Sequence, residues 1–197
     1  MENSITEIIC IVDKSGSMEM LKNETIDGLN NFIKSQQVEE TACNFSLVQF
    51  NQELSATIVR QPIKQVRLLH SQDYQPNGYT ALYDALGTTL QKAVQTIFTL
   101  PKELKPNKVM VFIITDGLEN ASRRYTKAAV QTLISKLTNN NEWEFEFYGA
   151  NINAFVEAEN IGVSRDKATN WEFNKFGVDN MVFEMSEKAS AFRKRNY

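Results

Sequence analysis

The stretch Ile8–Leu21 reads IICIVDKSGSMEML. It begins with a continuous apolar run, IICIV at residues 8–12, which ends abruptly at an acid, Asp13. An apolar run of this length is typical of a strand that is buried on both faces, as in a parallel sheet between two helical layers. Directly after Asp13, Ser15 and Ser17 alternate around Gly16. Folding requires no oxygen-bearing side chains at this place, so we expect these three to have a function at the end of the strand.

A second apolar run, KVMVFIIT at residues 108–115, also ends in an acid, Asp116, which is followed by Gly117. Apolar residues at helical spacing predict long helices over about Met18–Ser35 and Ala81–Thr99. Further helices are predicted over about Thr126–Asn139, Ala154–Asn160 and Val178–Arg193, and further strands over Asn44–Phe50, 54–63 and 143–150. The segment at about Ser71–Asn77 is predicted to be a polar loop.

The alternation of strands and helices predicts an α/β fold with right-handed crossovers, in which a mostly parallel, doubly wound sheet lies between two helical layers. The pair of strands at 44–50 and 54–63 is the exception, because the short segment between them is typical of a hairpin and makes that pair antiparallel. No repeat or low-complexity linker interrupts the chain, and we expect a single domain over residues 1–197.

Composition excludes some classes of function. The chain has 197 residues, of which 42% are hydrophobic and 23% are charged, and its net charge is -3. These values are typical of a globular protein, and the lack of a basic block argues against nucleic-acid binding. The only basic cluster, Arg193-Lys194-Arg195, is predicted to be the solvated end of a terminal helix.

The opening residues, MENSITEIIC, contain acids and no basic segment, so we expect no signal peptide, no membrane span and a cytoplasmic location. Cys10 and Cys43 have apolar or small neighbours and are interpreted as reduced packing residues. His70 has no cysteine or second histidine nearby, which argues against a zinc site and favours a surface position.

Ligands of open α/β sheets bind beyond the carboxyl ends of the strands, where the loops that carry Asp13, Ser15, Ser17, Thr80 and Asp116 are expected to meet. All five side chains offer hard oxygen atoms, which suit Mg²⁺, Mn²⁺ or Ca²⁺ and disfavour zinc and copper. Because three of the five groups are uncharged hydroxyls, the bound cation would stay electron-poor and would attract a carboxylate from another molecule.

These residues resemble the metal-ion-dependent adhesion site (MIDAS) of von Willebrand factor A (VWA) domains. The resemblance rests on Asp13-x-Ser15-x-Ser17, on Thr80 in YTALYDALG, and on Asp116 in FIITDGLENAS. It extends over nearly the whole chain, and the segment from residue 148 onward is similar to that of small stand-alone bacterial and phage members.

The resemblance implies a six-stranded sheet of order 3-2-1-4-5-6 whose third strand is antiparallel, in a three-layer sandwich. It implies that Ser15, Ser17 and Thr80 contact the metal directly, that Asp13 and Asp116 contact it directly or through water, and that a protein partner supplies an Asp or Glu. Many members have Gly-Gly-Thr in the second loop, where this chain has Gly78-Tyr79-Thr80. Tyr79 therefore either shades the metal or adds an aromatic contact.

Simpler interpretations exist for each motif taken alone. Ser15, Ser17 or Thr80 could cap a helix, and Asp116-Gly117 could be an ordinary turn. Past the third loop, Glu119, Asn120, Arg123 and Arg124 either rim the site or begin a solvated helix, and Asp84 either orients a metal loop or is a surface acid. Trp143 and Trp171 are expected to pack in the core or at an edge.

The function that we predict is a non-enzymatic, metal-dependent protein-binding module. An alternative is a Mg²⁺-dependent phosphotransferase or phosphatase that uses Asp13 as its nucleophile, although that chemistry needs a second acid two residues on, where this chain has Ser15. A Rossmann nucleotide site is disfavoured, because no G-x-G-x-x-G follows the first strand. The sequence leaves the partner and the oligomeric state open.

Overall fold

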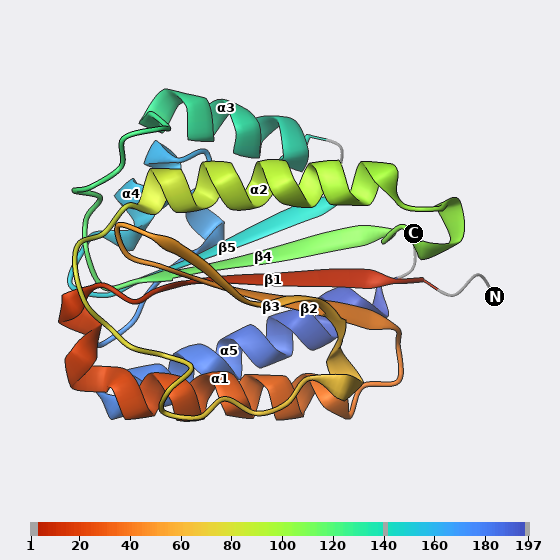
Figure 1. Cartoon of the computed structure of the whole chain (residues 1–197), viewed down its shortest axis with the longest axis horizontal. Helices are drawn as coiled ribbons and strands as arrows, with labels where there is room; N and C mark the ends of the chain where they lie inside the picture. The colour runs from red at the N-terminus through yellow and green to blue at the C-terminus, as the bar shows by residue number, and fades with distance from the viewer. Residues whose placement is uncertain (1–3, 140–141, 196–197) are drawn as a thin grey trace.

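The computed structural model (Figure 1) describes residues 4–139 and 142–195, and its strands form one sheet with helices on both faces. The strands are β1 (Thr6–Asp13), β2 (Cys43–Phe50), β3 (Leu54–Pro62), β4 (Lys108–Thr115), β5 (Trp143–Gly149) and β6 (Ala168–Asn170). The α-helices are α1 (Lys22–Gln37), α2 (Leu82–Thr99), α3 (Lys127–Thr138), α4 (Ala154–Asn160) and α5 (Lys175–Lys194). The domain predicted over 1–197 includes residues 1–3, 140–141 and 196–197, which lie outside the described part, and a single domain stays a prediction.

The sheet has the strand order β3-β2-β1-β4-β5-β6, and every neighbouring pair is parallel except β2 and β3. The predicted α/β class, strand order and antiparallel edge strand are confirmed. β1 lies between β2 and β4, in register from Thr6 opposite Lys108 to Val12 opposite Ile114. The carboxyl ends of β1 and β4 therefore lie side by side, at the left of Figure 1.

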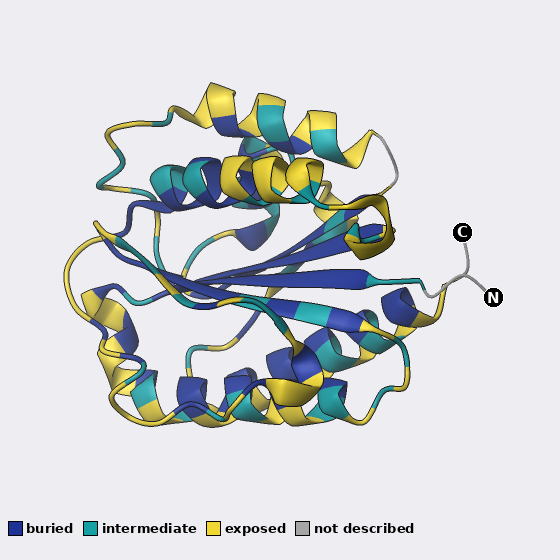
Figure 2. Cartoon of the chain, turned by 45° about the vertical axis from the view of Figure 1, so that its right-hand side comes forward, coloured by how far each residue is buried: buried dark blue, intermediate teal, exposed yellow. Residues whose placement is uncertain are grey.

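Alternate residues of the strands face two separate cores. On one face, Ile8 and Cys10 of β1 pack with apolar residues of α1 and α5, and on the other, Ile9 and Ile11 pack with those of α2, α3 and α4. Figure 2 shows that the central strands are buried while each helix is exposed on its outer side. The edge strand β3 is mostly half-buried or exposed. The β1 and β4 runs are apolar throughout because both of their faces are covered.

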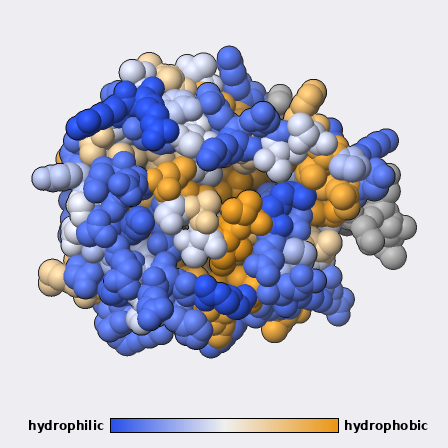
Figure 3. All heavy atoms as spheres, in the orientation of Figure 1, coloured by the Kyte–Doolittle hydropathy of each residue, from blue (hydrophilic) through white to orange (hydrophobic). Residues whose placement is uncertain are grey.

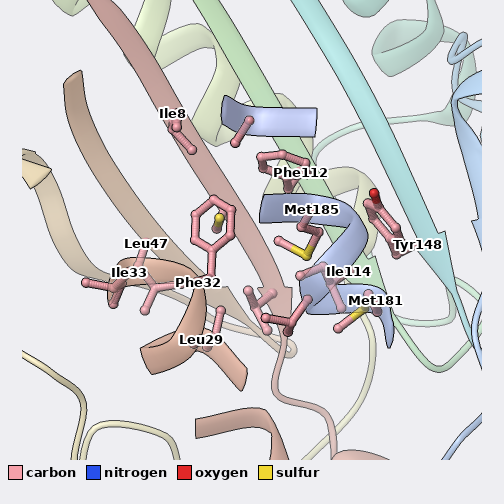
Figure 4. Packing of buried hydrophobic residues seen from close by; sticks show 14 of the residues in the cluster. Ile8, Leu29, Phe32, Ile33, Leu47, Phe112, Ile114, Tyr148, Met181 and Met185 are labelled. Atoms are coloured by element: carbon pink, nitrogen blue, oxygen red, sulfur yellow. The ribbon is translucent and has the colours of Figure 1, made fainter. Parts of the chain in front are cut away.

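In the core under α1 and α5, the rings of Phe32, Phe112 and Tyr148 lie among isoleucine, leucine and methionine side chains (Figure 4). Phe32 of α1 meets Phe112 of β4 edge to face, with ring centroids 5.6 Å apart. The residues that we expected to share one face of the last helix, Met181, Met185, Ala189 and Phe192, are all buried. Cys10 and Cys43 are buried free cysteines, Trp143 and Trp171 are buried, and His70 is exposed, as predicted. None of the helices in the described residues is long and apolar enough to cross a membrane.

The predicted solvated tail Arg193-Lys194-Arg195 is wrong at its first residue, since Arg193 is buried. Its guanidinium donates to the carbonyl oxygen of Gln36 at 2.7 Å and to the hydroxyl of Thr41 at 3.1 Å. The last carbonyls of a helix have no hydrogen-bond donor within the helix. Arg193 supplies such a donor to the last turn of α1. Lys194 and Arg195 are exposed.

Two other elements differ from the prediction. The helix expected from Met18 begins as a 3-10 helix, η1 (Gly16–Leu21), and becomes α-helical only at Lys22. The loop at 71–77 was predicted to be polar, but Tyr74 within it is completely buried in the core under α1 and α5.

Candidate metal centre

Three loops meet at the carboxyl edge of the sheet. The loop after β1 contacts the loop before α2 through two backbone hydrogen bonds, from Gly16 N–H to Gly78 O at 3.0 Å and from Asn77 N–H to Lys14 O at 2.8 Å. The loop after β4 lies next to both because β4 pairs with β1. Residues far apart in the sequence are thus held together by backbone contacts and sheet register.

Four of the five predicted metal ligands are linked by hydrogen bonds. Asp13 Oδ1 accepts the backbone N–H of Ser15 at 2.7 Å, which holds that carboxylate above its own loop. The hydroxyls of Ser15 and Ser17 are 3.1 Å apart, and Ser17 Oγ donates to Asp116 Oδ1 at 2.9 Å. The arrangement is a continuous row of oxygen atoms from the loop after β1 to the loop after β4.

Thr80 borders this row without a direct hydrogen bond from its hydroxyl to the other four ligands among the described residues. A Cβ placed on Gly117 would lie 3.6 Å from Thr80 Oγ1, so the hydroxyl faces the loop that carries Asp116. Asn120 fixes its backbone from both sides, since Thr80 N–H donates to Asn120 Oδ1 and Asn120 N–H donates to Thr80 O, each at 2.9 Å.

Both carboxylates are buried, Asp13 with 0% and Asp116 with 3% of its surface exposed. No Lys or Arg within residues 4–139 and 142–195 forms an ion pair with either. Burial raises the pKa of Asp13 to about 6, against hydrogen bonds from Thr115 and Ser15, and the nearby Asp116 raises it further. Burial likewise raises the pKa of Asp116. Two uncompensated acids in one place favour a bound cation.

Asp116 Oδ2 is the most informative atom of the site. It is buried and has no hydrogen-bond partner, although its sister oxygen accepts from Ser17. A buried carboxylate oxygen without a partner is costly and points to a missing ligand. Asp13, Ser15, Ser17, Thr80 and Asp116 together offer only hard oxygens, so these residues fit Mg²⁺, Mn²⁺ or Ca²⁺.

Two supporting residues were missed by sequence reasoning. Thr115 Oγ1 donates to Asp13 Oδ2 at 2.7 Å, and Tyr74 OH donates to the backbone oxygen of Asp13 at 2.5 Å. The role of Thr115 could have been predicted from the sequence, because it is a polar residue at the end of the strand that pairs with β1. The role of Tyr74 could not, because only the tertiary fold brings its loop beneath Asp13.

The residues expected near the rim have distinct places. Glu119 accepts the N–H groups of Ala121, Ser122 and Tyr83, and thereby joins the loop after β4 to the start of α2. Arg123 and Arg124 are exposed, and so is Tyr79, with 69% of its surface in solvent.

Asp84 holds the loop after β4, which carries Asp116, and is not a plain surface acid. It accepts three backbone N–H groups, from Arg123, Arg124 and Tyr125, at 2.8–2.9 Å. Partial burial alone would raise the pKa of Asp84, but these hydrogen bonds outweigh it and the pKa is lowered.

The alternative interpretation, that these hydroxyls cap helices, is not supported by the structure. Ser15 precedes η1, but its side chain makes no capping hydrogen bond, and the N-cap of α2 is Ala81 instead of Thr80. The hydroxyls of Ser15, Ser17 and Thr80 therefore do not cap the N-termini of the helices that follow them.

Comparison with solved structures gives relatives of the same fold at low identity. Proximal thread matrix protein 1 from the mussel byssus, solved with a zinc-occupied MIDAS motif, is 15% identical with a TM-score of 0.65, and the match covers 95% of this chain and 48% of that one. The vWF domain of the type V pili tip protein Mfa5 from Porphyromonas gingivalis is 9% identical with a TM-score of 0.66, and the match covers 99% and 98%. Manganese-loaded TRAP protein from Plasmodium vivax is 21% identical with a TM-score of 0.54, and the match covers 76% and 58%.

The chain spans about half the length of the mussel proteins it matches, 46–48%. No curated protein matches it. The family model of the von Willebrand factor type A domain matches residues 7–186, which include all five predicted ligands and the whole sheet except Thr6, the first residue of β1. The chain therefore belongs to the von Willebrand factor type A domain family.

Proposed function

We propose that this chain is a protein-binding module that uses a divalent cation, Mg²⁺ or else Mn²⁺ or Ca²⁺, to capture an Asp or Glu of a partner protein. Asp13, Ser15, Ser17, Thr80 and Asp116 would hold the cation, and the cation would supply an open coordination position for the partner's carboxylate. The observation that carries the proposal is the buried, unpartnered Asp116 Oδ2 beside the serine hydroxyls.

Charge balance supports an outside acid as the last ligand. The site provides at most two negative charges, and its other three donors are neutral hydroxyls. The edge is also partly open, because Ser17 is exposed while Asp13, Ser15, Thr80 and Asp116 are buried. The mussel and Plasmodium relatives were solved with zinc and manganese, respectively, which supports metal binding in this fold.

Isothermal titration with Mg²⁺, Mn²⁺, Ca²⁺ and Zn²⁺ tests the metal step. We expect Mg²⁺ or Mn²⁺ to bind with millimolar or tighter affinity, and Asp116→Ala and Ser15→Ala to abolish binding. Matched controls are Asp179→Ala on the exposed side of α5 and Ser71→Ala in an exposed loop, which should bind metal normally. Normal metal binding by both site variants would refute the proposal.

Partner capture is tested separately, by pull-down from host extract with Mg²⁺ and with EDTA. We expect a partner that is retained only with Mg²⁺, that is lost with Asp116→Ala, and that no longer binds once its own contacting Asp or Glu is replaced. The intracellular setting, and the role as a scaffold of a bacterial or phage assembly, remain parts of this proposal.

The phosphatase alternative is less well supported by the geometry. Both oxygens of Asp13 already accept hydrogen bonds, from Ser15 N–H and from Thr115 Oγ1, and the carboxylate is fully buried. A nucleophilic carboxylate needs a free oxygen that can reach phosphorus. A phosphatase screen with Mg²⁺ checks this, since turnover that is lost in Asp13→Asn would favour the enzyme.

A further inference from the structure

A cavity of about 330 Å³ lies between the second half of α2 and the sheet face of β1, β2 and β3, and none of the five predicted metal ligands lines it. We call it the α2–β3 pocket. Of β1, Glu7 and Ile9 in its first half line the pocket, whereas the predicted metal ligands begin at Asp13, the last residue of that strand. In Figure 3, hydrophobic residues gather on this side of the molecule below α2.

The pocket exists because the facing walls carry small side chains. Ala93 and Thr89 of α2 lie across from Ser46 of β2 and Ala56 of β3, where larger residues would have filled the space. The rest of the wall is aliphatic, with Ile9, Val48, Leu54, Ile58, Val59 and Ile97. A mostly apolar hollow of this size is at the small end of the range, about 300–1,000 Å³, that is usual for small-molecule sites.

Polar groups are present in this apolar wall, and one has no partner. Thr89 is buried with 6% of its surface exposed, and its hydroxyl makes no hydrogen bond. A threonine in a helix ordinarily bonds a carbonyl of the preceding turn, so an orphaned hydroxyl beside a cavity points to a ligand.

The charged groups of the pocket are Glu7, Arg60 and Lys92. The single acid is already paired, because Arg60 Nε lies 3.1 Å from Glu7 Oε2. Arg60 also donates from Nη2 to Leu104 O at 2.7 Å, and its backbone has a positive φ of 46° with its N–H bonded to Ser46 Oγ. No described residue forms an ion pair with Lys92. The pocket therefore has at least one positive charge in excess, whether Glu7 is ionised or protonated.

We propose that the α2–β3 pocket binds a small amphiphilic carboxylate, such as a medium-chain fatty acid. Its chain would lie between α2 and the sheet, and its carboxylate would contact Arg60 and Lys92, with Thr89 Oγ1 free to donate. Apolar walls with an excess cation and an unused hydroxyl complement an anionic head on an apolar tail.

An added strand from a protein is a poorer occupant of this side of the molecule. β3 is the edge strand, but its pairing with β2 is interrupted by two register shifts, and it ends in Pro62. Bulges and prolines are the usual features that block edge-to-edge pairing. Because the irregular edge of β3 disfavours an added strand, a small molecule in the pocket is the better-supported ligand on this side of the molecule.

The test is octanoate titration of the ¹⁵N-labelled protein, below the critical micelle concentration, with n-octanol and n-octylamine as matched probes. We expect octanoate to shift amide resonances of α2 and β3 around the pocket. We also expect it to bind about fivefold more tightly than either probe, which corresponds to the upper value for one exposed ion pair. The titration is run in EDTA and repeated with Mg²⁺. Equal binding by all three probes, or no octanoate shifts at the pocket, would overturn the proposal.

The EDTA arm separates this site from the proposed metal site, which could itself take a carboxylate. Octanoate binding that needs Mg²⁺ or disappears in Ser15→Ala would assign the carboxylate to the metal centre and refute the pocket. Binding that is unchanged in EDTA and in Ser15→Ala supports it.

Variants locate the contacts. Lys92→Gln should weaken octanoate binding about fivefold, as for loss of an exposed ion pair, while Lys102→Gln should not change it. Thr89→Val should weaken it, while the neighbouring Thr88→Val, which lines a different hollow, serves as the matched control. Ala93→Leu should fill the pocket and abolish binding. Unchanged octanoate affinity in all three pocket variants, with native spectra, would refute the site.

Discussion

Thr115 is the residue on which the geometry of Asp13 depends most directly. Its hydroxyl donates to Asp13 Oδ2 at 2.7 Å in a fully buried position. Thr115→Val keeps the shape but leaves a buried carboxylate oxygen without a donor, which costs about 1–3 kcal/mol. We expect the free energy of unfolding to fall by that amount in urea denaturation, and Mn²⁺ affinity to fall about tenfold, as is usual when a group that orients a ligand is lost.

Thr115→Ser separates the hydroxyl from the packing of the methyl group. This variant should keep Mn²⁺ affinity near wild type, with at most a small loss of stability. If Thr115→Val bound Mn²⁺ as tightly as the wild-type protein, the hydrogen bond to Asp13 would have no part in metal binding.

At the scale of elements, Asp84 joins the first turn of α2 to the segment before α3. Asp84→Ala would release the N–H groups of Arg123, Arg124 and Tyr125, which it accepts at 2.8–2.9 Å. We expect faster hydrogen exchange at these three amides and weaker Mg²⁺ binding, because the same loop carries Asp116. The exposed variant Asp179→Ala is the control, and unchanged exchange in Asp84→Ala would contradict the anchoring role.

The contact between α1 and α5 depends on the buried Arg193. Arg193→Met would leave the carbonyl oxygens of Gln36 and Thr41 without their donor, at a cost of about 1–3 kcal/mol for each. We expect a clear drop in the midpoint of urea unfolding. Arg195→Met, at an exposed position, should change the midpoint little. Equal midpoints for the two variants would show that the end of α1 is satisfied in another way.

Elements with strong local patterns were predictable, and those that depend on tertiary contacts were not. β1 and β4 were predicted because residues 8–12 and 109–114 are apolar on both faces, and the predicted helices follow regular apolar spacing. Buried Tyr74 and Arg193 were missed because each satisfies a backbone group far away in the sequence. The five metal residues were predicted from their places after strands and before α2, and metal binding by them stays a prediction.

At the scale of the whole molecule, the two proposed sites use different residues of β1. The metal residues begin at Asp13, at the carboxyl end of the strand, and the α2–β3 pocket is lined by Glu7 and Ile9 in its first half. β1 is buried along its full length and pairs on both sides, so it is a rigid spacer between them. We therefore expect octanoate and Mg²⁺ to bind independently, which the titrations with and without EDTA measure.

Global stability should depend on pH through Glu7. Burial raises the pKa of Glu7 from 4.5 to about 7, although Arg60 and Asn44 act in the opposite direction. Between these values the folded chain holds a proton that the unfolded chain has released, so the free energy of unfolding falls as pH rises from about 4.5 to 7. At about 1.4 kcal/mol for each pKa unit, the Glu7 contribution is of the order of a few kcal/mol.

Glu7→Gln removes this contribution and should flatten the fall in stability across that range. Urea unfolding in EDTA at several pH values measures it, and the difference between wild type and variant isolates Glu7 from Asp13 and Asp116, whose pKa values are also raised. Glu53→Gln, at an exposed position, is the control. A Glu7→Gln profile parallel to that of wild type would mean that Arg60 keeps Glu7 ionised in the folded chain throughout this range.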